Sequence, residues 1–138
     1  MKQWIVLCLV AVAVGVGLIP MMAWSHEGHD KLPGSLSAPH GGQIKGTEHL
    51  YVELVADAEG VKLYPLDHDL KPVALGEVKI EGTFQLPRTK KSESLQWTQV
   101  ENYYEAKVKA KGTHRYNIEL KVSYKNKADK LSFTVEPQ

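Results

Sequence analysis

Residues 103–124 have the sequence YYEAKVKAKGTHRYNIELKVSY, and this stretch decides the fold class. Apolar side chains alternate with polar ones on both sides of a Lys-Gly-Thr turn at residues 111–113. A period of two is typical of strands that bury one face. The pattern predicts two strands, residues 103–110 and 114–124, joined as a hairpin. The apolar positions that define it are Tyr104, Ala106, Val108, Ala110, Tyr116, Ile118, Leu120, Val122 and Tyr124.

Similar short segments flank this stretch, and we expect strands at residues 49–55, 61–64, 76–80, 83–86, 95–100 and 131–136. In the first, Leu50, Val52 and Leu54 alternate with polar residues. A turn at residues 57–60 closes a hairpin, and Pro65 is expected to end the next strand or to place it at a sheet edge. Seven or eight such strands, without a helical period after residue 25, predict an all-β, immunoglobulin-like β-sandwich, with a small barrel as the alternative.

The N-terminal residues have the features of an export signal. Lys2 precedes an uncharged apolar run at residues 4–19, and Ala23 and Ser25 occupy the positions that a signal peptidase recognises. We therefore expect cleavage after Ser25 and a periplasmic or secreted protein, with a membrane anchor at residues 4–24 as the alternative. The expected organisation is a signal peptide at residues 1–25, a flexible histidine-rich segment at residues 26–43 and a β-sandwich at residues 44–138.

Composition limits the classes of function. Removal of Lys2 with the signal leaves equal numbers of basic and acidic residues, which argues against a nucleic-acid or anionic-membrane partner. Cys8 and all methionines precede residue 26, so a metal site in the exported chain must use imidazole, carboxylate, backbone or terminal amine groups. No nucleophile motif or phosphate loop is present, so we do not expect an enzyme. A copper oxidase built on an N-terminal histidine is the enzymatic alternative.

Histidines and acidic residues gather at residues 26–53, which hold four of the six histidines. The sequence HEGHD at residues 26–30 combines imidazoles and carboxylates that suit a divalent transition metal, Zn²⁺ or Cu²⁺ first, with Ni²⁺ and Co²⁺ as alternatives. If the chain begins at His26, its α-amine and imidazole together chelate Cu²⁺. The candidate ligands in this segment are His26, Glu27, His29 and Asp30, and the alternative is a solvated polar tail.

Further candidate ligands follow, namely His40, His49, Glu53 and His68. The sequence PHGG at residues 39–42 predicts a turn that holds His40 away from the chain. His49 and Glu53 share a strand face but lie about 13 Å apart, so either would need His40 to fold back over the strand. His68 lies between Asp67 and Asp69, where an ordinary polar turn is the alternative, and His114 beside Arg115 is expected to be structural.

Four motifs together resemble a known family. The chain contains HEGHD (26–30), PHGG (39–42), HLYVELV (49–55) and LYPLDHDLKPV (63–73) in that order. This order resembles small exported domains found beside, or fused to, the periplasmic adaptor subunits of RND-type heavy-metal efflux pumps. The resemblance implies a periplasmic β-sandwich that handles divalent metal, with His40, His49 and Glu53 at motif positions and an efflux adaptor as partner. The N-terminal histidine also resembles that of small periplasmic copper carriers, although the missing methionines argue against Cu⁺.

The expected function is therefore that of a periplasmic protein that binds a divalent heavy metal and buffers or carries it in connection with efflux or resistance. The alternative is an envelope interaction module in which the sandwich binds another protein and the histidines have no metal role.

Overall fold

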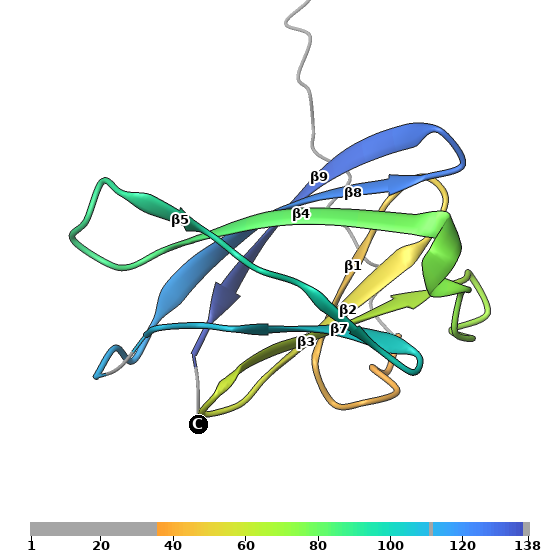
Figure 1. The fold of residues 1–138 in the computed structure, drawn as a ribbon. Coiled ribbons are helices and arrows are strands. Elements are labelled where there is room, and N and C mark those ends of the chain that lie inside the picture. The colour runs from red at the N-terminus through yellow and green to blue at the C-terminus, as the bar shows by residue number, and fades with distance from the viewer. Residues whose placement is uncertain (1–35, 111, 137–138) are drawn as a thin grey trace, which may run out of the picture.

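The computed structural model describes residues 36–110 and 112–136, which form two antiparallel sheets packed face to face (Figure 1). The five-stranded sheet has the order β1 (Gln43–Gly46), β2 (Tyr51–Ala56), β3 (Gly60–Leu66), β7 (Tyr103–Lys107), β6 (Thr98–Val100). The four-stranded sheet has the order β5 (Ser92–Ser94), β4 (Val78–Gln85), β8 (Tyr116–Tyr124), β9 (Lys127–Val135). A short 3₁₀ helix, η1 (Leu75–Glu77), precedes β4. The predicted all-β sandwich is thus confirmed, and the two separate sheets differ from the alternative of a closed barrel.

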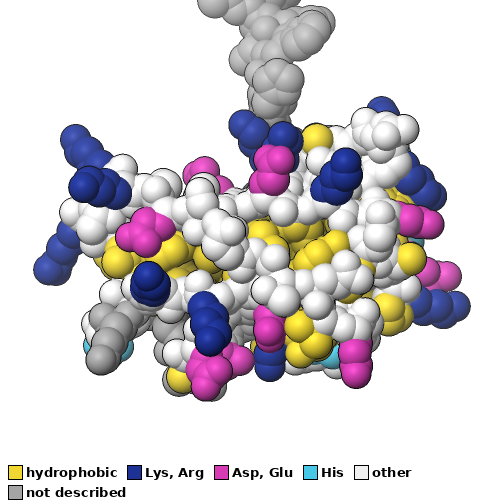
Figure 2. Space-filling view, in the orientation of Figure 1, with side chains coloured by type: hydrophobic (Ala, Val, Ile, Leu, Met, Phe, Trp, Pro, Cys, Tyr) yellow, Lys and Arg dark blue, Asp and Glu magenta, His cyan; other side chains and the backbone are white. Residues whose placement is uncertain are grey.

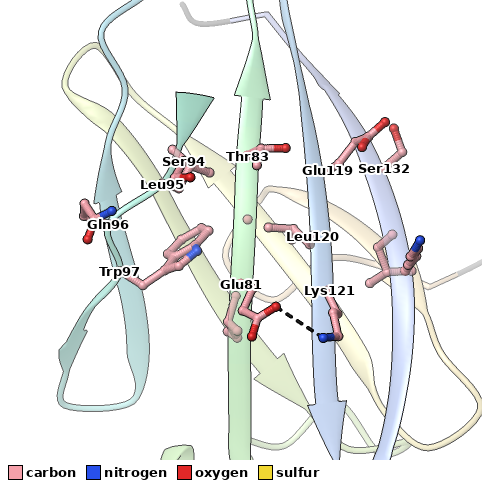
Figure 3. Close-up of a pocket in the computed structure, with 14 residues that line it drawn as sticks. Glu81, Thr83, Ser94, Leu95, Gln96, Trp97, Glu119, Leu120, Lys121 and Ser132 are labelled. Carbon is pink, nitrogen blue, oxygen red and sulfur yellow. Dashed lines mark hydrogen bonds and ion pairs between the residues drawn. The ribbon is translucent and has the colours of Figure 1, made fainter. Parts of the chain in front are cut away.

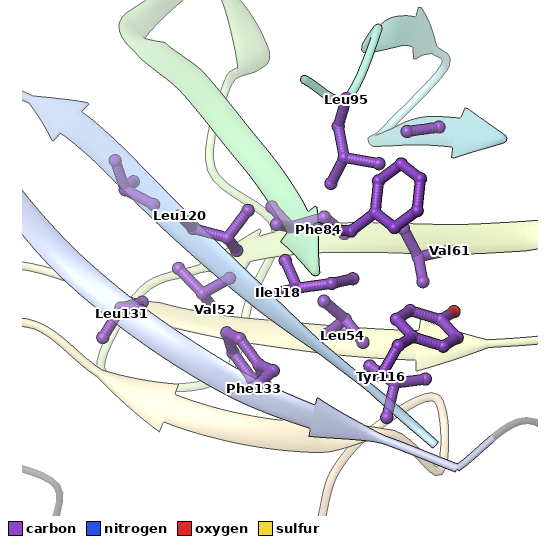
Figure 4. Packing of buried hydrophobic residues seen from close by; sticks show 14 of the residues in the cluster. Val52, Leu54, Val61, Phe84, Leu95, Tyr116, Ile118, Leu120, Leu131 and Phe133 are labelled. Carbon is purple, nitrogen blue, oxygen red and sulfur yellow. The ribbon is translucent and has the colours of Figure 1, made fainter. Parts of the chain in front are cut away.

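The core lies between the two sheets and is built from alternate residues of the long strands (Figure 4). On β8 the even-numbered positions from Tyr116 to Val122 are at most 2% exposed, whereas Asn117, Glu119 and Lys121 between them are exposed. Phe133 of β9 is fully buried among them. The alternation in the sequence therefore identified the buried face correctly, because each apolar side chain gains free energy only on the side that faces the other sheet.

The predicted hairpin between residues 103–110 and 114–124 is wrong. β7 pairs with β3 and β6, whereas β8 pairs with β4 and β9 in the other sheet. The residues between β7 and β8 therefore cross from one sheet to the other. Both strands do bury the face that their alternation predicts, but alternation carries no information about which strand lies alongside.

Pro65 does not end its strand, because β3 continues to Leu66 and Pro65 lies opposite Val52 of β2. On the other side, the pairing of β3 with β7 covers only Gly60 to Leu63. On that side the Val73 N–H donates to the Pro65 carbonyl at 3.1 Å and Leu66 forms an isolated bridge with Pro72, but no strand of the sheet pairs with Pro65 there, so its missing N–H breaks no ladder. The second alternative, a place at an edge, is correct for this end of the strand.

Other strand boundaries also differ from those expected. The two segments expected around Gly82 form one continuous strand, β4, and residues 95–100 do not form one strand. β5 ends before Leu95 in the four-stranded sheet and β6 begins after Trp97 in the five-stranded sheet, so the residues between them cross over. β1 was not predicted at all, because its four residues are too few to show a period, although the expected domain boundary at residue 44 falls within it.

Residues 1–35, which include the expected signal peptide and the candidate ligands His26, Glu27, His29 and Asp30, lie outside the described residues. Within the described part of the chain, no helix has the length and apolar character needed to cross a membrane.

Candidate functional site

Glu53 is the only charged side chain buried in the described residues, with 0% of its side chain exposed. It lies in the middle of β2, on the face turned away from the core, between Ile44 of β1 and Tyr64 of β3. Its oxygen Oε1 accepts hydrogen bonds from the backbone N–H groups of His40 at 2.8 Å and Gly42 at 2.9 Å. Its Oε2 lies 2.8 Å from Nδ1 of His40. These three contacts supply the partners that a buried carboxylate requires.

The turn at residues 38–42 folds back over β2 and brings His40 onto Glu53. It closes with a hydrogen bond from the Gly41 N–H to the Ala38 carbonyl at 3.1 Å. Gly41 has a φ of 75°, a conformation that side-chain-bearing residues rarely adopt. Gly42 lies so close to the Leu54 carbonyl that a Cβ would overlap it. The two glycines of the PHGG sequence therefore have separate roles, one conformational and one of close approach.

Aromatic rings surround His40 on the outer face of the five-stranded sheet. The imidazole stacks on Tyr64 with ring centroids 3.8 Å apart and an interplanar angle of 11°. Tyr64 contacts Tyr103 in turn, with centroids 5.2 Å apart. Burial raises the pKa of Tyr64, an effect that the nearby Lys62 ammonium opposes, so the phenol is neutral near pH 7. The Tyr64 ring thus packs against one face of the His40 imidazole, and the Glu53 carboxylate contacts the ring edge at Nδ1.

This arrangement fixes the chemistry of the imidazole. An ionised carboxylate only accepts hydrogen bonds, so Nδ1 of His40 is the nitrogen that carries hydrogen. The second nitrogen, Nε2, has no hydrogen-bond partner among residues 36–110 and 112–136, and the side chain is 33% exposed. A neutral imidazole in this tautomer presents the Nε2 lone pair as a metal ligand or proton acceptor. Carboxylates commonly orient metal-binding histidines in this way.

The structure does not bring the other candidate histidines to His40. His49 lies in the turn before β2, with Nε2 3.8 Å from the exposed Glu48 carboxylate. His68 lies beyond β3 and contacts the Tyr51 ring edge-on, with centroids 5.4 Å apart. Among the described residues, no group of three or more His, Cys, Asp or Glu side chains is close enough to hold a metal ion. Among residues 36–110 and 112–136, His40 is the histidine whose imidazole contacts a buried carboxylate.

A pocket with a volume of about 920 Å³ lies elsewhere, on the four-stranded sheet (Figure 3). It contains none of the candidate metal ligands. Lys121 and Glu81 form an ion pair in it at 3.3 Å, and Trp97 points from the crossing segment toward β4. The Trp97 indole packs on Gly82, and a Cβ added to Gly82 would lie 3.1 Å from the indole Nε1. This Nε1 is buried and has no hydrogen-bond partner among the described residues.

Sequence reasoning identified His40 and Glu53 but missed Tyr64 and Tyr103. The alternation in residues 61–64 places Tyr64 on the face opposite to Leu63, so its outward orientation was available from the sequence. Its position beside Glu53 was not, because it depends on the register between β2 and β3. No local signal indicates Tyr103, which reaches the site through the pairing of β7 with β3.

Comparison with known proteins gives no further assignment: no protein-family model matches the chain, and no curated protein or solved structure is significantly similar to it.

Proposed function

We propose that this protein binds a divalent transition-metal ion, with Nε2 of His40 as the ligand supplied by the folded domain. The observation that carries the proposal is the contact between the buried Glu53 carboxylate and Nδ1 of His40 at 2.8 Å. A fully buried carboxylate is costly, and its position behind an imidazole is an arrangement that increases the basicity of the exposed nitrogen. In this proposal Glu53 orients the ligand and does not itself bind the metal.

The remaining ligands come from the segment that precedes the domain, in this proposal His26, Glu27, His29 and Asp30. Asp30 lies ten positions before His40, and a chain of that length reaches at most about 35 Å, which is enough to return to the imidazole. One imidazole alone binds Zn²⁺ or Cu²⁺ weakly, whereas three or four nitrogen and oxygen ligands form a stable site. His49 and His68 are secondary candidates, because each already contacts a neighbour away from His40.

The biological task that fits this chemistry is buffering or carriage of Zn²⁺ or Cu²⁺ in the periplasm, in connection with metal efflux or resistance. The apolar N-terminal run and the order of the four sequence motifs support this setting. An efflux-pump adaptor is the partner to which such a carrier would deliver the ion.

Calorimetric titration of the chain beginning at His26 with Zn²⁺ and Cu²⁺ at pH 7 tests the proposal. We expect one-to-one binding with a dissociation constant below about 1 µM. His40→Ala should weaken it at least tenfold, whereas His114→Ala, a histidine outside the site, should leave it unchanged. Binding should disappear as the pH falls through the range in which histidines titrate, because the ligand must be neutral. Affinity no better than about 1 mM, or equal affinity in His40→Ala, would reject the proposal.

A second candidate is an interaction module without a metal role, and one observation favours it. Tyr51, Tyr64 and Tyr103 all lie on the outer face of the five-stranded sheet, as the registers of β2, β3 and β7 require. Tyrosines gathered on one face are typical of protein interfaces. Binding to an efflux adaptor that survives His40→Ala combined with His49→Ala, but fails in Tyr103→Ser, would favour this candidate.

A further inference from the structure

One end of the sandwich holds both arginines of the chain, Arg88 and Arg115, in a single pocket of about 400 Å³. Arg88 comes from the turn between β4 and β5, and Arg115 from the residue before β8. These residues are 27 positions apart in the sequence but line the same hollow. The other cations of the chain are lysines, so the convergence of the only two guanidinium groups is a specific feature of the fold.

The floor of this pocket is a row of polar side chains across three strands. Gln85 of β4 lies directly opposite Asn117 of β8, and Asn117 lies opposite Thr134 of β9. Residues directly opposite each other in a sheet share a face, so the three side chains emerge side by side. Arg115 is two positions before Asn117 and therefore on the same face. The register thus places one guanidinium at the end of a polar row.

Hydrogen bonds hold the walls of the pocket in place. The Gln85 side-chain amide donates to the Thr89 carbonyl at 2.8 Å, and the Thr89 hydroxyl donates to the Leu86 carbonyl at 3.0 Å. These contacts fix the turn that carries Arg88, whose φ of 65° is rare for a residue with a side chain. The turn is therefore organised before any ligand binds.

The donors of the pocket are largely uncommitted. Asn117 accepts a hydrogen bond from the Thr134 hydroxyl at 3.2 Å through its oxygen, which leaves its NH₂ group without a partner among the described residues. Arg115 contacts Glu136 only through Nε, at 3.8 Å, and both side chains are about two-thirds exposed. Such an exposed pair is weak, so the two terminal nitrogens of this guanidinium remain for another anion. No ion pair engages Arg88 within residues 36–110 and 112–136.

Cations outnumber carboxylates around the pocket although the whole chain is nearly neutral. Residues 85–91, 114–117 and 134–136 contain four lysines and arginines and one carboxylate, Glu136, while Glu93 of β5 and Asp57, whose charge acts on Tyr116, lie nearby. Figure 2 shows Lys and Arg side chains gathered at the end of the molecule where Figure 1 places the turn between β4 and β5. An anion that approaches this end is attracted before it makes any contact.

We propose that this pocket binds a phosphate group. Guanidinium groups recognise phosphate through two parallel N–H···O bonds, and two of them match the nearly double negative charge of a phosphate monoester. The amide of Asn117 supplies a further donor for the remaining oxygen. The group belongs either to a soluble phosphorylated molecule or to a lipid head group, and the volume of the pocket accommodates the phosphate with part of the molecule attached.

The test follows backbone amide resonances of the purified protein during titration with potassium phosphate against potassium chloride at equal ionic strength. We expect saturable shifts at Thr89 and Asn117, with a dissociation constant on the order of 1 mM. Arg88→Gln and Arg115→Gln should each weaken binding at least fivefold. The control Lys127→Gln, at the opposite end of β8 and β9, should have no effect. Both arginines are exposed or in a surface turn, and unchanged resonances elsewhere verify that the variants fold.

Three results would overturn the proposal: no saturable shift, an equal effect of Lys127→Gln, or acetate binding as tightly as phosphate. Vesicles distinguish the two sources of the phosphate group. Sedimentation with phosphatidylglycerol vesicles but not with phosphatidylcholine vesicles, lost in Arg88→Gln, would assign a lipid head group. Binding of free phosphate without sedimentation would assign a soluble ligand.

Discussion

Glu53→Gln separates the orienting role of Glu53 from its role in packing, because it replaces one carboxylate oxygen with an NH₂ group of nearly the same size. In the parent protein the backbone N–H groups of His40 and Gly42 donate to Oε1 of Glu53 at 2.8 and 2.9 Å. The oxygen that remains in the glutamine can still accept these two hydrogen bonds. The new NH₂ group would then face Nδ1 of His40, where two donors oppose each other. The imidazole resolves this conflict by moving its hydrogen to Nε2, which removes the free lone pair.

The cost in stability follows from the same contacts. A hydrogen bond to a charged group contributes about 1.5–3 kcal/mol and a neutral one about 0.5–1.5 kcal/mol, so each backbone bond loses about 1 kcal/mol. The free energy of unfolding should therefore fall by up to about 2 kcal/mol. The fall is smaller to the extent that the neutral glutamine avoids the desolvation penalty of a buried carboxylate. For a domain of this size that corresponds to a Tm lower by at most about 8–16 °C. Loss of the orienting partner should weaken metal binding by about 10–100-fold.

Nitrogen NMR of the His40 ring, thermal unfolding and Zn²⁺ titration measure these three effects separately. We expect hydrogen on Nδ1 in the parent protein and on Nε2 in Glu53→Gln. Glu48→Gln is the matched control, because its exposed carboxylate lies 3.8 Å from His49 and supports no buried group. The same tautomer in both proteins would refute the reasoning about His40 irrespective of metal. A changed tautomer with unchanged Zn²⁺ affinity would instead refute the role of His40 as a ligand.

Three further perturbations test the surrounding structure. Gly42→Ala should destabilise the domain by about 2–4 kcal/mol in urea unfolding, because its Cβ overlaps the Leu54 carbonyl, whereas Gly41→Ala has open space and should lose only about 1 kcal/mol from its positive φ. Equal losses would contradict this division of roles. Tyr104→Phe removes a hydroxyl that lies 2.8 Å from the carbonyl oxygens of Leu75 in η1 and Val78 in β4, so we expect a loss of about 1–2 kcal/mol in the same assay, and no loss would show that the link contributes nothing. Hydrogen bonds from the 57–60 turn lower the pKa of Asp57 below 3.8, with Lys62 adding to the effect. The folded state therefore binds this proton less readily than the unfolded state, and the stabilisation is present above about pH 5 and is lost as the pH falls through the folded pKa. Asp57→Asn should make urea unfolding less dependent on pH below 5, and an unchanged acid dependence would contradict this.

The faces of the strands followed from the sequence, but their partners did not. Ile118 and Leu120 alternate with charged residues, and this local period was enough to identify the buried side of β8. The period does not say which strand lies alongside, so the segments flanking Gly112 were assigned to a hairpin although they belong to different sheets. The sequence also did not predict that the chain passes from one sheet to the other near Trp97. An extended segment has the same local sequence pattern whether it stays in one sheet or passes to the other.

The candidate site divides in the same way. The PHGG sequence indicated a turn that presents His40, and Glu53 was a candidate on the strand face that alternation also assigned to His49. The contact between them requires the turn to fold back over β2, and the stacking on Tyr64 requires the register between β2 and β3. The pocket of Arg88 and Arg115 had no sequence signal, because a balanced overall charge conceals where cations gather.

The sequence by itself therefore determined the class of the fold, the buried faces of β2, β7 and β8, and the residue types that could bind a metal. Tertiary structure alone decided that Glu53 supports His40 and that two distant arginines share one pocket. The physical reason is that alternation and turn propensity act between residues a few positions apart. Sheet pairing, in contrast, depends on free energy gained between residues far apart in the chain, and no local segment contains that information.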